Sequence, residues 1–196
     1  MLRGLGQQAV EVRLPRDLEG VSGLIIPGGE STTIGKLAVQ NGLMEPIRAL
    51  AETKPVWGTC AGAIFLSRDA RRQQPLLGLM DIAVERNAFG RQVDSFEIDL
   101  EVPALAGLDE PTARHNGHGP DAGANSSAGT HPFHGMFIRA PLIERVGPDV
   151  EVLARLPDGR MVAARQRGLL ATSFHPELTD DDRFHRLFVA MAQARA

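Results

Sequence analysis

The chain of 196 residues has a single cysteine, a single tryptophan and no tyrosine. One cysteine excludes an internal disulfide framework and a cysteine-rich zinc site, and it fits a reducing compartment. An aromatic content of 5% argues against a broad stacking platform for nucleic-acid bases. The net charge of −3 gives no electrostatic footprint for nucleic acid or for an anionic membrane.

Long apolar runs are also missing, since no stretch approaches the ~20 residues that a membrane helix needs. The first six residues, MLRGLG, are too short and too rich in glycine for a signal peptide. We therefore expect a cytoplasmic protein with neither a nucleic-acid nor a membrane partner. The length fits one domain over residues 1–196.

The first half of the sequence alternates short apolar runs with helical patterns, which is typical of a parallel α/β sheet. Expected strands lie at residues 8–14, 23–26 and 56–57. Expected helices lie at residues 44–52 and 61–71, and a further one is capped by residues 31–33 and carries Ile34, Leu37 and Ala38.

The second half predicts an antiparallel extension of this sheet and a C-terminal helix. Its expected elements are a strand at 96–102 with one wet face, a hairpin of 150–156 with 161–164, a strand at 169–174, and a helix from near Thr179 with an apolar stripe of Phe184, Leu187, Phe188 and Met191.

Residues 112–132 interrupt this order with glycine, alanine, serine, asparagine and histidine, and we expect a flexible surface insertion there. Two histidine pairs lie in or beside the insertion, His115 with His118 and His131 with His134. Flexible histidine pairs without carboxylate or cysteine support are usually incidental. We therefore expect no metal site.

The single cysteine, Cys60, lies where an apolar strand ends and a helix begins, in the segment VWGTCAGA. Such an elbow exposes a side chain at the sheet edge and is a common way to present a nucleophile. The positive end of the helix dipole favours a thiolate there. A small buried cysteine within a helix is the alternative reading of this segment alone.

A thiolate nucleophile needs a base, and the base needs an orienting group. Of the six histidines, only His175 follows a buried-looking strand, at the edge where parallel sheets place ligands. Glu177 comes two residues later, and the proline between them fixes an extended turn. The residues therefore predict a triad of Cys60, His175 and Glu177, although a lone His-Pro-Glu is usually only a turn.

Acyl transfer also needs an oxyanion hole of backbone N–H donors. The amide of Ala61, directly after the nucleophile, is one candidate. The glycine turn that includes Gly28 is the other, because glycines let backbone amides turn toward a ligand. The sequence has neither a Gly-x-Gly-x-x-Gly nor a Walker pattern, so nucleotide binding has no support.

Five blocks in conserved order carry a resemblance to one family: LIIPGGESTTIGKL, GTCAGAIFLS, VERNAFGRQVDSFE, MFIRAP and SFHPELTDD. They resemble the glutaminase subunit of the two-protein pyridoxal 5′-phosphate synthase, a class I (triad-type) glutamine amidotransferase. The resemblance implies a flavodoxin-like three-layer α/β sandwich without a cofactor. It also implies that Cys60 attacks L-glutamine and that the ammonia passes to the synthase subunit in a large hetero-oligomer.

The same resemblance implies which residues contact glutamine. An arginine can hold the substrate α-carboxylate, and an acidic residue can meet its α-ammonium group. The positions that match the family's glutamine site are Gly29, Glu30, Ser31, Arg86, Ile138 and Arg139.

Two departures from the family pattern are the insertion at 112–132 and the lack of the apolar first strand and most of the following helix. We expect this lack to leave an unpaired sheet edge and an open core face, and we favour a misassigned or truncated start of the chain. Two other functions stay open: an impaired subunit that only docks the synthase, and a glutaminase of another class I complex.

Overall fold

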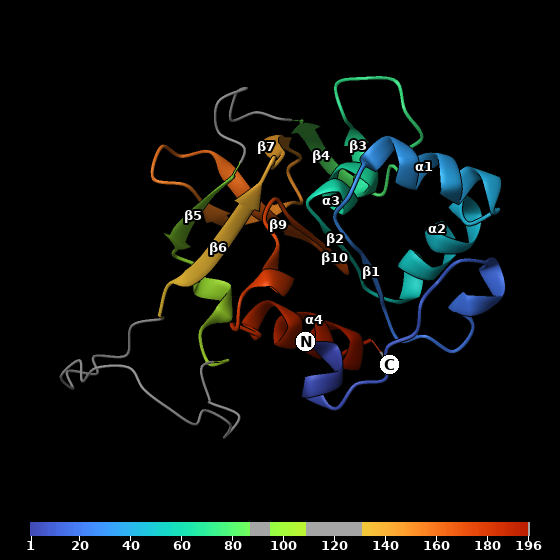
Figure 1. The fold of residues 1–196 in the computed structure, drawn as a ribbon, viewed down its shortest axis with the longest axis horizontal. Helices are drawn as coiled ribbons and strands as arrows, with labels where there is room; N and C mark the ends of the chain where they lie inside the picture. Colours follow the sequence, from blue (N-terminus) through green and yellow to red (C-terminus); the bar gives the residue numbers. More distant parts are fainter. Residues whose placement is uncertain (87–94, 109–130, 196) are drawn as a thin grey trace.

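The computed structural model of the protein describes residues 1–86, 95–108 and 131–195 (Figure 1). Within them a mixed sheet of eight strands forms the centre, and a separate two-stranded sheet lies beside it. The order of the central sheet is β1-β2-β10-β9-β7-β4-β3, with β8 paired to β9. The central strands are β1 (Leu24–Ile26), β2 (Val56–Thr59), β3 (Ser67–Asp69), β4 (Met80–Glu85), β7 (Leu142–Val146), β8 (Glu151–Arg155), β9 (Met161–Gln166) and β10 (Leu169–Thr172).

β2 runs parallel to both of its neighbours, β1 and β10, whereas β9 and β7 continue the sheet in antiparallel pairs. The two-stranded sheet joins β5 (Ser95–Leu100) to β6 (Phe133–Ile138) in antiparallel register. The helices are α1 (Ser31–Gln40), α2 (Met44–Thr53), α3 (Ala61–Leu66) and α4 (Arg183–Gln193), and the 3₁₀ turns are η1 (Leu2–Leu5), η2 (Pro15–Leu18), η3 (Pro103–Leu105) and η4 (Pro176–Leu178).

Two apolar clusters make the molecule three-layered, with α1, α2 and α3 on one side of the sheet and α4 on the other (Figure 1). The alternation of side chains along β2 separates them, because Val56 belongs to the first cluster and Trp57 to the second. Phe184 and Phe188 of α4 pack on Trp57. The α/β sandwich with an antiparallel extension that the sequence predicts is therefore confirmed.

Most predicted elements are confirmed, and four details were wrong. The helix at 31–38 is capped by the carboxylate of Glu30, which accepts the N–H of Thr33, and not by residues 31–33. The helix expected at 61–71 ends at Leu66, because the chain enters β3 there. The C-terminal helix begins at Arg183, after η4 and a short turn. The strand expected at 96–102 lies in the separate sheet, not in the main one.

Residues 8–14 were also expected to form a strand, and this prediction was wrong. None of the backbone groups of residues 8–12 hydrogen-bonds to another backbone group in the described part of the chain. An alternating pattern gives a segment two faces but no neighbouring edge, and without that edge no ladder forms. The insertion at 112–132 lies outside the described residues, except for His131 and Pro132.

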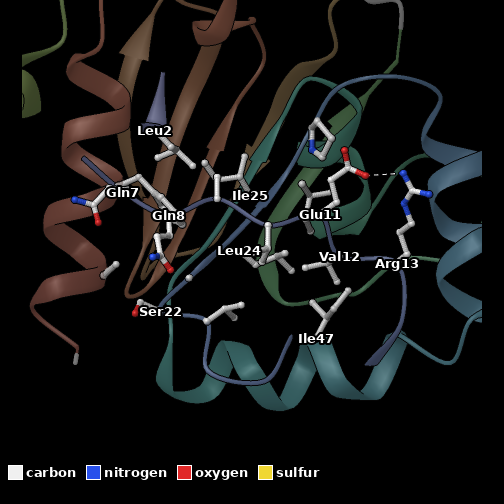
Figure 2. A pocket seen from close by; sticks show the side chains of 18 of the residues that line it. Leu2, Gln7, Gln8, Glu11, Val12, Arg13, Ser22, Leu24, Ile25 and Ile47 are labelled. Carbon is white, nitrogen blue, oxygen red and sulfur yellow. Dashed lines mark hydrogen bonds and ion pairs between the residues drawn. The ribbon is translucent and has the colours of Figure 1, made fainter. Parts of the chain in front are cut away.

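A cavity of about 1220 Å³ lies beside β1 (Figure 2). Its lining includes Leu24 of β1, Ile47 of α2 and Val12 of the extended segment, and the ion pair of Glu11 with Arg13 lies at its border. Among the described strands β1 pairs only with β2. In the described part of the chain, β1 therefore has an unpaired edge and an open core face beside it.

In the described part of the chain, no helix is both long and apolar enough to cross a membrane.

Candidate active site

Cys60 occupies a strained turn between β2 and α3. Its backbone has φ 49° and ψ −111°, a conformation that residues other than glycine rarely adopt. Gly62 permits the turn, because a Cβ at that position would collide with the carbonyl oxygen of Ile26 in β1. The Cys60 N–H donates to the carbonyl of Thr172 at the end of β10, 2.8 Å away. The local sequence Gly-Thr-Cys-Ala-Gly thus folds as the elbow that the sequence predicts, but Cys60 is buried, with 7% of its surface exposed, so the expected exposure of its side chain was wrong.

His175 and Glu177 follow β10, the strand next to the elbow. The His175 N–H donates to the carbonyl of Met136 in β6 at 2.9 Å. Phe174, the residue before His175, is completely buried. The Nδ1 atom of His175 lies 2.8 Å from Oε1 of Glu177. Pro176 opens η4 between them, which turns both side chains to one side.

The electrostatics join these two residues to Cys60. Hydrogen bonds of the His175 ring with Cys60 and with Glu177 raise the pKa of His175 to about 10. Burial opposes ionisation of Glu177, but its hydrogen bond with His175 lowers its pKa below the usual value. The His175 ring is thus hydrogen-bonded to both Cys60 and Glu177. The structure therefore brings all three predicted triad residues together.

The two residues expected to line an oxyanion hole both adjoin this group. Gly28 follows β1, and a Cβ at that position would come within 2.5 Å of Cε1 of His175 and 3.4 Å of Cβ of Cys60. Ala61 begins α3, and the first amides of a helix have no partner inside it. Gly29, with φ 136°, completes the turn next to Gly28.

Glu30 and Arg86 form an ion pair beside the glycine turn, with Nη2 of Arg86 2.8 Å from Oε1 of Glu30. Hydrogen bonds from Thr32 and from the backbone of Thr33 lower the pKa of Glu30 to about 2, against the effect of desolvation. The other terminal nitrogen of Arg86, Nη1, is buried and has no hydrogen-bond partner among the described residues. A buried guanidinium donor without a partner is costly, and it suits a site that takes a carboxylate.

The remaining predicted contacts lie at different depths. Ser31 is buried, and its hydroxyl lies 3.2–3.3 Å from the side-chain amide of Gln74. Ile138 ends β6 with 37% of its surface exposed, and Arg139 follows in a left-handed conformation, φ 43°. The Arg139 side chain makes no hydrogen bond or ion pair with the part of the chain that the structure describes. The structure therefore places these two residues at the rim, two and three residues beyond the Met136 carbonyl that holds His175.

Sequence reasoning missed two residues that support the site. Gln74 holds Ser31 from a loop 43 positions away, and Thr172 accepts the indole N–H of Trp57 at 3.1 Å. Neither residue stands in a motif that marks such a role. The sequence analysis placed residues 169–174 in an antiparallel extension, whereas β10 pairs in parallel with β2, so the contact of Trp57 with Thr172 was not expected.

His134 lies between two carboxylates. Its two ring nitrogens lie 2.8 Å from Asp99 and 3.0 Å from Glu97. Both hydrogen bonds raise the pKa of His134, and the bond to Asp99 has the larger effect. In the residues that the structure describes, no group of three histidine, cysteine or acidic side chains is arranged to hold a metal ion. His115 and His118 lie outside those residues.

The sequence is similar to proteins of known family over nearly its whole length. The sequence pattern of the SNO glutamine amidotransferase family matches residues 2–194. The chain belongs to this family. A relative from Herpetosiphon aurantiacus named pyridoxal 5′-phosphate synthase subunit PdxT is 54% identical over 97% of this chain and 91% of its own length. The subunit of the same name from Thermus thermophilus is 52% identical over 97% of this chain and 88% of its own length.

Solved structures agree with the family assignment. A crystal structure titled glutamine amidotransferase superposes with a TM-score of 0.82 at 47% identity, covering 98% of this chain and 90% of that one. The structure of PurLQS from Thermotoga maritima superposes with a TM-score of 0.58 at 16% identity, covering 88% of this chain and 81% of that one. The second likeness concerns the fold alone.

Proposed function

We propose that this member of the SNO family hydrolyses L-glutamine to L-glutamate and ammonia, and delivers the ammonia to the synthase subunit that makes pyridoxal 5′-phosphate. One observation carries the proposal: Cys60 at a strained elbow contacts an imidazole that is itself held by a carboxylate at 2.8 Å. Relatives at 51–54% identity that are named subunits of pyridoxal 5′-phosphate synthase support the same reaction. A cytoplasmic location is proposed with it, supported by the single free cysteine.

The reaction begins with the Cys60 thiolate attacking the side-chain amide carbon of glutamine. The C–S bond forms, and the carbonyl electrons move to oxygen, where the amides of Ala61 and of the Gly28 turn would meet the developing charge. The tetrahedral intermediate then collapses: the C–N bond breaks, the His175 imidazolium gives its proton to the leaving nitrogen, and ammonia departs.

Water completes the cycle on the resulting thioester. Neutral His175 takes a proton from water while the oxygen attacks the thioester carbon, and Glu177 stabilises the imidazolium that forms. Breakage of the C–S bond releases glutamate and restores the thiolate beside the imidazolium. The hydrogen bonds that raise the pKa of His175 to about 10 favour the imidazolium that starts this cycle.

Substrate recognition is proposed for the residues around the glycine turn. The Nη1 atom of Arg86 is free for the α-carboxylate, and Glu30 is the acidic group for the α-ammonium. Gly29 and Ser31 would offer backbone groups on the same turn, while Ile138 and Arg139 would close the site from the end of β6.

The test mixes the chain with its synthase partner and measures glutamate release from glutamine. We expect release that requires the partner and that Cys60→Ala abolishes. A second candidate, a subunit that docks the synthase without turnover, is favoured by the cavity beside β1, because an incompletely covered core weakens the strands under the site. Calorimetric binding of the synthase without any glutamate release would select this candidate. If the pyridoxal 5′-phosphate synthase subunit neither binds nor activates the chain, the result would point to another class I complex.

A further inference from the structure

His185 is a buried titratable residue that the proposed reaction does not use. It lies in the first turn of α4, with 5% of its surface exposed. Its Nδ1 atom is buried and has no hydrogen-bond partner among the described residues. A buried polar atom without a partner costs about 1–3 kcal/mol, so the position calls for an explanation.

The imidazole of His185 packs edge-on against Trp57. The two ring centroids lie 5.0 Å apart at 70°, and Trp57 is completely buried. Edge-to-face contacts of this kind are directional, so they fix the orientation of both rings. The contact therefore ties the start of α4 to the middle of β2.

Trp57 also bonds to the strand that precedes His175. Its indole N–H donates to Oγ1 of Thr172 at 3.1 Å, and the Thr172 carbonyl accepts the N–H of Cys60 at 2.8 Å. Trp57 lies three residues before Cys60, and Thr172 lies three residues before His175. His175 and Glu177 are thus held between two fixed ends: Thr172 before them and the first turn of α4 after them.

We propose that His185 is a positioning residue for the triad, which as a neutral imidazole holds Trp57 and, through Thr172, the segment that carries His175 and Glu177. This role rests on the proposed function of Cys60. Burial and then the nearby amino group of Met1 lower the pKa of His185, whereas the carboxylates of Glu177 and Asp182 act in the opposite direction.

The role has a defined pH dependence. Because the folded protein disfavours the charged form of His185, the unfolded chain binds more protons below the ordinary histidine pKa of about 6.5. Stability around α4 therefore falls as the pH drops below that value. A charged His185 also attracts the carboxylate of Glu177, in competition with His175. Acid should therefore loosen the triad.

The experiment measures alkylation of Cys60 by iodoacetamide between pH 4.5 and 8, followed by mass spectrometry. Cys60 is the only cysteine in the sequence, so the label is unambiguous. We compare wild type with His185→Asn, whose amide keeps a polar atom near Nδ1 but cannot titrate. His185→Leu removes the polar atom as well. His134→Asn is the matched control, because it removes an exposed titratable histidine held by Asp99 and Glu97 instead.

The alkylation rate falls on the acid side of its pH profile, and we expect this acid limb to move to lower pH by about half a pH unit in both His185 variants. At a fixed pH on the limb, the variants should therefore react about threefold faster than wild type. His134→Asn should coincide with wild type. Superimposable limbs in wild type and His185→Asn would overturn the role, even if both His185 variants melt at lower temperature. If His185→Leu does not fold, His185→Asn alone decides. The proposed function fails separately, if His175→Ala leaves the alkylation rate of Cys60 unchanged.

Discussion

Replacement of Gly28 by alanine tests how closely the glycine turn fits the triad. The added Cβ would lie 2.5 Å from Cε1 of His175, whereas carbon atoms pack at about 3.5–4.0 Å. The ring or the turn must therefore move by about 1 Å. A displacement of this size at reacting groups costs about 100-fold in rate. We expect Gly28→Ala to reduce partner-dependent glutamate release by about that factor.

The assay is glutamate release with the synthase subunit at saturating glutamine, together with circular dichroism to show that the variant folds. Gly4→Ala is the control, since a Cβ at Gly4 meets no atom within 4 Å. The backbone of Gly28 is not in the left-handed region, so the fold should tolerate alanine at a cost of about 1–3 kcal/mol. A folded Gly28→Ala protein within about threefold of wild-type activity would refute the reasoning.

Three further outcomes are expected. Arg86→Lys should raise the KM for glutamine about tenfold with little change in kcat, since a lysine lacks the planar fork that can hold Glu30 with one nitrogen and the α-carboxylate with the other; an unchanged KM in steady-state kinetics would contradict this. The raised pKa of His175 means that its pairing stabilises the fold fully below pH ~6.5, and that this contribution is lost as the pH rises through about 10. The difference in free energy of unfolding between wild type and His175→Ala, measured in urea, should therefore be smaller at pH 10 than at pH 7. Arg183→Leu should destabilise the fold by about 2–3 kcal/mol, because Arg183 is buried and bonds Asp181 and the carbonyls of residues 131 and 132; equal urea midpoints would argue against it.

The elements that were predictable from the sequence are those with a local signal. The strand that ends in Pro27, the hairpin around residues 157–160 and the elbow at Cys60 each carry a turn residue next to an apolar run. The triad could be predicted for the same reason, since Cys60 and His175 each follow a strand, and Glu177 lies two residues beyond His175. Parallel strands place their carboxyl ends at one edge of a sheet, so these ends were expected to meet.

Long-range contacts decided the features that the sequence did not predict. Residues 8–14 alternate like a strand, but a strand needs a partner edge that their own sequence cannot supply. β5 and β6 pair only with each other among the described strands, and the stacking of Phe96 on Phe137, with ring centroids 4.5 Å apart, is a cross-strand contact that neither segment's own pattern specifies. The contact of His185 with Trp57 joins residues 128 positions apart, and a lone histidine on an apolar helix face carries no signal for it.

The hydrogen bond from the Cys60 N–H to Thr172 limits how this site can meet an oxyanion. Because that amide is already committed to the sheet, the nucleophile cannot supply a donor from its own backbone. One donor must come from Ala61 on the same segment, and the other from a separate segment, the turn at Gly28 and Gly29. The reactivity of the thiol and the stabilisation of the intermediate are therefore independent variables. A change in one peptide of the glycine turn would therefore alter the stabilisation of the intermediate without moving the thiol, its base or their charges.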